Sequence, residues 1–187
     1  MEFVEPIKDK KQLEAMKTYL KGKNKRDWLI FILGINSGLR ISDLLSLNVE
    51  DVKDKDRIAL REDKTNKVKN FPISDTCKKA INEYLKDSGL TTGALFPSRK
   101  DKGSKNTGAI SRQQAYEAIN NAARAVGIKD KIGTHTLRKS FGYHAYKKGV
   151  GLEVIQKLLN HSAPSVTLRY IGITQEQLDE VYINLNL

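Results

Sequence analysis

Residues 135–170 read HTLRKSFGYHAYKKGVGLEVIQKLLNHSAPSVTLRY, and this stretch decides our interpretation of the chain. His135 and Arg138 lie at its start, His161 follows, and Tyr170 closes it. Guanidinium groups bind phosphate oxygens through paired donors, imidazoles transfer protons near neutral pH, and a phenol can act as a nucleophile. His144 lies off these motifs, and we interpret it as structural.

A second arginine motif lies near the amino end, where residues 37–45 read SGLRISDLL. The apolar pattern predicts a helix over residues 25–36 that ends at Gly38, followed by a short helix that holds Leu44 and Leu45. Arg40 therefore lies at a helix junction, where its side chain can point into a cleft. Two arginines, two histidines and a tyrosine suit chemistry on a phosphodiester that needs no metal ion, and the sequence contains no metal-binding cluster.

The charge balance indicates a polyanionic partner. The 187 residues include 33 Lys and Arg against 22 Asp and Glu, which gives a net charge of +11. Neutralising phosphates with such an excess releases condensed counterions and favours binding to nucleic acid. The chain shows no internal repeat and no interdomain linker, so we expect one domain over residues 1–187.

The same sequence indicates a cytoplasmic protein without a membrane segment. Cys77 is the single cysteine, which excludes an internal disulfide and fits a reducing compartment. The amino terminus lacks the pattern of a signal peptide. The most apolar stretch, residues 28–35, is far shorter than the roughly 20 residues that span a bilayer.

Helical patterns dominate the rest of the chain. Apolar spacing and capping residues predict helices from Asp9 onward and over residues 25–36, 75–87, 112–126, 135–148, 152–159, 164–170 and 175–185. Residues 57–60 and 68–73 predict two strands of a hairpin around the polar turn 63–67. We therefore expect an α+β fold that is mainly α-helical, with a small antiparallel sheet of about three strands.

These motifs together resemble the catalytic domain of tyrosine recombinases, the phage integrase family. SGLRISDLL is similar to that family's first arginine motif, HTLR at 135–138 to its HxLR motif, and LLNHS at 158–162 to its LLGHS motif before the nucleophile. Lys64 falls on the hairpin tip, where the family places its catalytic lysine. Four elements in order are far more specific than any one of them. The resemblance covers nearly the whole chain and implies the fold of DNA breaking-rejoining enzymes.

The resemblance implies a set of catalytic residues, namely Arg40, Lys64, His135, Arg138, His161 and Tyr170. The tyrosine would attack phosphorus to give a 3′-phosphotyrosyl link and a free 5′-hydroxyl, which conserves the bond energy without ATP. The arginines would bind the non-bridging oxygens, His135 would act as the base, and His161 would donate a hydrogen bond to the phosphate.

The resemblance also implies roles for a lysine and an acidic residue. Lys64 would protonate the departing 5′-oxygen, although a shift of register would exchange it for Lys67 or Lys69. Asp43 would support the site by orienting its neighbours. Each residue alone also has a structural explanation: Arg40 could form a helix-terminal ion pair, and Tyr170 could be a surface aromatic. Their joint occurrence in order favours the active site.

The implied activity is that of a site-specific DNA recombinase or integrase that cleaves and rejoins double-stranded DNA without a metal or other cofactor. One alternative is an auxiliary DNA-binding regulator that uses the recombinase fold, and another is nicking and resealing like a type IB topoisomerase. The chain departs from the family pattern at Asn160, where the family usually has glycine. The family's amino-terminal core-binding domain, which clamps DNA, is also expected to be absent.

Two further sets of residues are candidates for contact with partners. The helix over 175–185 could dock on a neighbouring copy, as in a tetramer on DNA, or could pack in the core. Candidate DNA-binding side chains lie in the loop over 98–108, on the hairpin and before the HTLR motif: Arg99, Lys100, Lys102, Lys105, Lys67, Lys69, Lys129 and Lys131. The alternative for these cations is an ordinary solvated surface.

Overall fold

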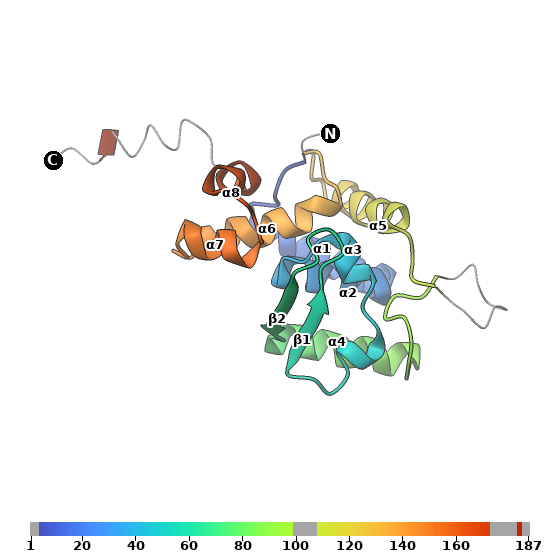
Figure 1. The fold of residues 1–187 in the computed structure, drawn as a ribbon. Coiled ribbons are helices and arrows are strands. Elements are labelled where there is room, and N and C mark those ends of the chain that lie inside the picture. Colours follow the sequence, from blue (N-terminus) through green and yellow to red (C-terminus); the bar gives the residue numbers. More distant parts are fainter. Residues whose placement is uncertain (1–3, 99–107, 173–182, 185–187) are drawn as a thin grey trace.

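The computed structural model describes residues 4–98, 108–172 and 183–184. Figure 1 shows helices on several sides of a central helix, α2, with one hairpin beside them. None of the described helices is long and apolar enough to cross a bilayer. The elements are α1 (Lys10–Lys23), α2 (Lys25–Ser37), α3 (Ile41–Leu45), the 3₁₀ helix η1 (Val49–Asp51), β1 (Arg57–Arg61), β2 (Val68–Pro72), α4 (Asp75–Ser88), α5 (Arg112–Ala125), α6 (Thr134–Lys147), α7 (Leu152–Leu158) and α8 (Pro164–Ile171).

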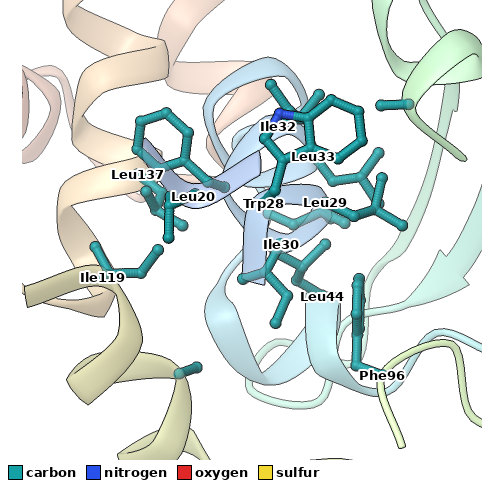
Figure 2. Close-up of a cluster of buried hydrophobic side chains, with 14 of the residues drawn as sticks. Leu20, Trp28, Leu29, Ile30, Ile32, Leu33, Leu44, Phe96, Ile119 and Leu137 are labelled. Carbon is teal, nitrogen blue, oxygen red and sulfur yellow. The ribbon is translucent and has the colours of Figure 1, made fainter. Parts of the chain in front are cut away.

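Helix α2 forms the centre of the main core. Leu29, Ile30 and Phe31 are fully buried, and α2 packs against α1, α3, α4, α5 and α6. Figure 2 shows its apolar side chains together with those of the surrounding elements, such as Leu137 of α6. A helix that is apolar on nearly all sides must be surrounded by others, which is why the run at residues 28–35 forms a buried helix.

The end of α2 directs the chain toward α6. Gly38 has a φ of 61°, in the left-handed region, and ends the helix. A Cβ atom at Gly38 would lie 2.5 Å from the Phe141 ring of α6. Both the backbone conformation and the close approach therefore require glycine. The turn places Arg40 at the start of α3, beside α6.

The sheet has two strands among the described residues, so the expectation of about three is wrong. β1 and β2 pair antiparallel, with Ile58 opposite Phe71 and Leu60 opposite Lys69. Elsewhere Asn48 meets Ala94, and Pro97 meets Ala109, only as isolated bridges. At the second bridge, the N–H groups of Ser98 and Ile110 donate to the carbonyls of Gly108 and Phe96, and the pairing extends no further among the described residues.

A smaller apolar cluster holds the last three helices together. Ile155 and Leu159 pack against Ile171 of α8, with Phe141 of α6 beside them. Gly142 allows the close contact of α6 with α8, because a Cβ atom there would lie 2.8 Å from Ile171. This cluster fixes the position of α8 relative to α6. The expected helix over 175–185 and most of the loop over 98–108 lie outside the described residues, apart from residues 98, 108, 183 and 184.

We expect Gly142→Ala to lower the free energy of unfolding by about 1–3 kcal/mol, because the added methyl group overpacks the contact between α6 and α8. Urea unfolding followed by circular dichroism measures this. Gly22→Ala is the matched control, since nothing lies within 4 Å of a Cβ atom at this exposed position in α1. Alanine should stabilise that helix by roughly 0.5–1 kcal/mol. Equal effects at both positions would contradict the packing argument.

Candidate active site

Arg138 lies at the centre of the site and connects its two halves. It is a large side chain on α6 with 2% exposure. Its Nη1 donates to the carbonyl of Gly38 at 2.6 Å, and its Nη2 donates to the carbonyl of Leu159. The guanidinium thus joins the turn after α2 to the turn after α7. A guanidinium has five N–H donors, so these two bonds leave others that can face Tyr170 and a phosphate.

Arg40 lies between two buried carboxylates. Its Nη1 is 2.8 Å from Oε2 of Glu62 and 3.9 Å from Oδ2 of Asp43. The charge contact does not have hydrogen-bond geometry, so Arg40 Nη1 has no hydrogen-bond partner among the described residues. Asp43 Oδ1 accepts a hydrogen bond from the backbone N–H of Asp63 at 3.0 Å, which attaches the hairpin to α3. Asp43 therefore contacts two parts of the site, Arg40 and the hairpin.

The two carboxylates have opposite pKa shifts. Burial raises the pKa of Asp43, the Asp63 hydrogen bond opposes this, and the charge of Glu62 adds to it. Burial would also raise the pKa of Glu62, but three contacts outweigh it and lower the pKa to about 2. These are hydrogen bonds from Thr65 and Asn160 and the contact with Arg40. Glu62 is therefore ionised at neutral pH.

Tyr170 of α8 lies between two imidazole rings. Its hydroxyl is 3.2 Å from Nδ1 of His135, and the rings of His135 and His161 meet its ring edge-on at centroid distances of 6.4 and 4.8 Å. The guanidinium carbon of Arg138 is 5.9 Å from the centre of the phenol ring. The structure thus brings together the phenol, both imidazoles and one guanidinium from α6, α8 and the turn between α7 and α8.

The protonation states follow from burial and from the surrounding cations. Burial raises the pKa of Tyr170, although the charges of Arg138 and Arg40 oppose this, so the phenol keeps its proton near neutral pH. Partial burial lowers the pKa of His135, and the charge of Arg138 adds to this effect. A neutral His135 beside a protonated phenol has the arrangement of a general base and its substrate proton.

His161 is also neutral at physiological pH. Burial lowers its pKa to about 4, with the charges of Arg138 and Arg40 adding to the shift. Its Nδ1 lies 3.0 Å from the hydroxyl of Thr167, which is fully buried in α8. When Thr167 donates to Nδ1, the ring carries its proton on Nε2 and can donate a hydrogen bond there.

Two lysines of the hairpin differ in their surroundings. Lys64 is exposed in the turn, and its charge acts on His135. Lys69 is half-buried on β2, with its Nζ 3.4 Å from the carbonyl of Ser37. Burial lowers the pKa of Lys69 to about 8, and the charges of Arg138 and Arg40 also act on it. Lys69, which the sequence analysis left as an alternative to Lys64, therefore lies close enough to both arginines for their charges to lower its pKa.

The remaining candidate cations differ in whether the structure describes them. Lys67, Lys129 and Lys131 are exposed at the surface. The loop residues 99, 100, 102 and 105 lie outside the described residues. His144, interpreted as structural, has its Nε2 2.9 Å from the carbonyl oxygen of Ile7 and joins the amino-terminal segment to α6.

Sequence reasoning missed Glu62 and Thr167. A glutamate in a polar turn gives no local signal of burial, since only the approach of Arg40 and Asn160 encloses it. Asn160 offered a partial signal, because it departs from the glycine of the motif that it resembles. Its φ of 49° explains why glycine or asparagine suits this position.

The order of the motifs and this geometry agree with comparisons to known proteins. The model of the phage integrase family matches residues 7–177. The chain belongs to the phage integrase family. It is 44% identical over 182 residues to the Bacillus subtilis (strain 168) protein named "Probable integrase/recombinase YoeC", which covers 97% of each chain.

Longer family members match over part of their length. The tyrosine recombinase XerA of Pyrococcus horikoshii (strain ATCC 700860 / DSM 12428 / JCM 9974 / NBRC 100139 / OT-3) is 34% identical over 172 residues, which cover 89% of this chain and 57% of that protein. The crystal structure of a XerA recombinase superposes with a TM-score of 0.78 at 21% identity, over 100% of this chain and 67% of that one. A lambda integrase dimer bound to a COC′ core site gives 0.72 at 16% identity, over 93% and 51%. These likenesses show the fold.

We expect the imidazole of His161 to remain neutral until the pH falls to about 4. Because the ring in the unfolded chain protonates near pH 6.5, the unfolded state binds more protons between these values, and the folded state should lose stability as the pH falls from 6.5 toward 4. NMR titration of the three histidines measures the shift. His161→Asn should remove this part of the pH dependence. A midpoint at or above 6.5 for His161 would contradict the burial argument.

Proposed function

We propose that the chain is a site-specific tyrosine recombinase that cleaves and rejoins double-stranded DNA through a covalent 3′-phosphotyrosine intermediate. The observation that carries the proposal is the placement of the Tyr170 hydroxyl 3.2 Å from His135, beside Arg138 and His161. Membership of the phage integrase family and identity to named recombinases support it.

The first step is an attack on phosphorus by the Tyr170 oxygen. The lowered pKa of His135 keeps its ring neutral, and in the tautomer with the ring proton on Nε2 its Nδ1 takes the phenolic proton. A bond forms between the tyrosine oxygen and phosphorus, and the bond from phosphorus to the 5′-oxygen breaks. Arg40 and Arg138 stabilise the negative charge on the non-bridging oxygens, and His161 donates a hydrogen bond from Nε2.

The first step ends when the leaving group is protonated, and the second step then reverses the first with a strand of the partner duplex. The departing 5′-oxygen takes a proton from a lysine of the hairpin, and we assign this role to Lys64. A 5′-hydroxyl from the partner duplex then attacks phosphorus and gives its proton to the neutral lysine, the bond between phosphorus and the Tyr170 oxygen breaks, and the protonated His135 returns the phenolic proton, which restores a phosphodiester. The number of phosphoester bonds is unchanged, so no external energy source is required.

We also propose how the chain contacts DNA and assembles on it. The net charge of +11 and the exposed Lys67, Lys129 and Lys131 support contact with the DNA backbone. A lambda integrase tetramer bound to a Holliday junction shares the fold, with a TM-score of 0.72. We propose that this chain also acts as a tetramer on DNA, with residues 175–185 contacting a neighbouring copy, and that residues 1–187 form one catalytic domain.

We expect wild-type protein to form a covalent adduct with a nicked suicide duplex that carries its recombination site, and Tyr170→Phe to form none, because phenylalanine lacks the nucleophile. Denaturing gel electrophoresis detects the adduct. Tyr146→Phe is the control, since Tyr146 is exposed on α6 outside the site. If the wild-type protein binds DNA without forming an adduct, the chain is an auxiliary DNA-binding regulator.

A substrate with sulfur in place of the bridging 5′-oxygen identifies the acid, because a thiolate leaves without protonation. We expect Lys64→Ala to slow cleavage of the ordinary duplex by about 10²–10⁴-fold and the sulfur substrate to restore the rate. Lys69→Ala should cleave both substrates slowly, so that the sulfur substrate does not restore its rate. Rescue of Lys69→Ala alone would transfer the role to Lys69, and the wild-type rate should then fall above a pH of about 8.

A further inference from the structure

We propose that Glu62 and Asn160 are positioning residues, which hold Arg40 and the hairpin turn in the arrangement that strand cleavage requires. This inference rests on the proposed function and deepens it. The pair forms a buried polar link between the β1–β2 hairpin and the turn that precedes His161. Neither side chain need touch the DNA to perform this role.

The buried carboxylate of Glu62 contacts three other side chains. Its side chain has no exposed surface. Its Oε2 accepts hydrogen bonds from Thr65 Oγ1 at 2.6 Å and from Asn160 Nδ2 at 2.8 Å. The same oxygen is 2.8 Å from Nη1 of Arg40. A buried charge is costly unless it is paired and hydrogen-bonded, so these contacts must persist together.

The carboxylate is also the counterion of the whole cationic cluster. Its charge acts on Arg138, Lys69 and His161 as well as on Arg40. Two guanidinium groups and an ammonium group repel one another when they are brought together away from water. An ionised Glu62 offsets that repulsion and lets the cations stay close before a phosphate arrives. The site is thereby arranged in advance for the charge of the transition state.

Asn160 performs two tasks that glycine could not combine. Its backbone has a φ of 49°, a conformation that glycine adopts freely and asparagine tolerates. Its amide then reaches Glu62, which lies 98 positions away in the sequence. Glycine would satisfy the backbone but would remove the donor. The replacement of the family's glycine is therefore explained by the buried glutamate that it meets.

The link also fixes the turn that carries Lys64. Glu62 and Thr65 flank this lysine, and their side-chain bond closes the turn. The backbone supports the same closure, because Asn66 N–H donates to the Glu62 carbonyl at 2.8 Å. Asn160 holds the closed turn against the segment before His161. Loss of its amide should release the turn and Arg40 without removing any group that reacts.

The test compares Asn160→Gly with wild type in single-turnover cleavage of the suicide duplex at saturating protein. We expect the rate constant to fall by about 10–100-fold, as for other misplaced catalytic groups, while DNA affinity changes less than about twofold. Asp54→Gly is the matched control, because Asp54 is another left-handed residue and lies in the loop before β1. It should cleave at the wild-type rate.

A double variant separates positioning from general stability. If Asn160 acts through Glu62, then Asn160→Gly should cause almost no further loss in a Glu62→Ala background, which has no side-chain acceptor for the Asn160 amide. Losses that multiply, or an Asn160→Gly protein that cleaves like wild type, would overturn the inference. If Glu62→Ala does not fold, the single Asn160→Gly comparison decides, since glycine suits that backbone. Absence of an adduct with wild-type protein would instead overturn the proposed function and this inference with it.

Discussion

The buried guanidinium of Arg138 is the contact on which the arrangement of the site depends. It donates to the carbonyls of Gly38 and Leu159, and the first of these lies 100 positions away. Carbonyl groups at the ends of helices lack partners within the helix, so a buried arginine that satisfies two of them joins the two turns firmly. Arg40 follows one of these turns, and His161 follows the other. The distance between these two groups is thus set by one side chain.

Burial of several cations in one place determines the chemistry that the site can perform. Burial lowers the pKa of His135 and of His161, and the neighbouring guanidinium groups add to this effect, which leaves both imidazoles neutral. Burial keeps the proton on Tyr170 until a base removes it. Glu62 remains ionised in their midst because it accepts hydrogen bonds and contacts Arg40. The result is a neutral imidazole, a protonated phenol and a group of positive charges close together, an arrangement suited to phosphoryl transfer.

Much of the fold could be predicted because its signals are local. The helices over 25–36, 75–87 and 164–170 agree with α2, α4 and α8 to within a residue or so, since apolar spacing and caps mark both ends. The expected third strand was wrong because two short segments with strand-like pairing meet only at isolated bridges. Whether such segments extend a sheet depends on which part of the chain lies beside them, and no local sequence pattern determines that.

The phenol, the imidazoles and the arginines that meet in the structure could be picked out from the sequence, because each lies in a short motif whose neighbours specify a turn or a helix start. Gly38 before Arg40 is one example, since a left-handed turn requires it. Glu62, in contrast, became part of the site only through contacts with Arg40 and Asn160, which are distant in sequence. The shifted pKa of His161 and the proximity of Lys69 to the arginines have the same origin. Burial and charge proximity are properties of packing, so they arise only when separate segments of the chain meet.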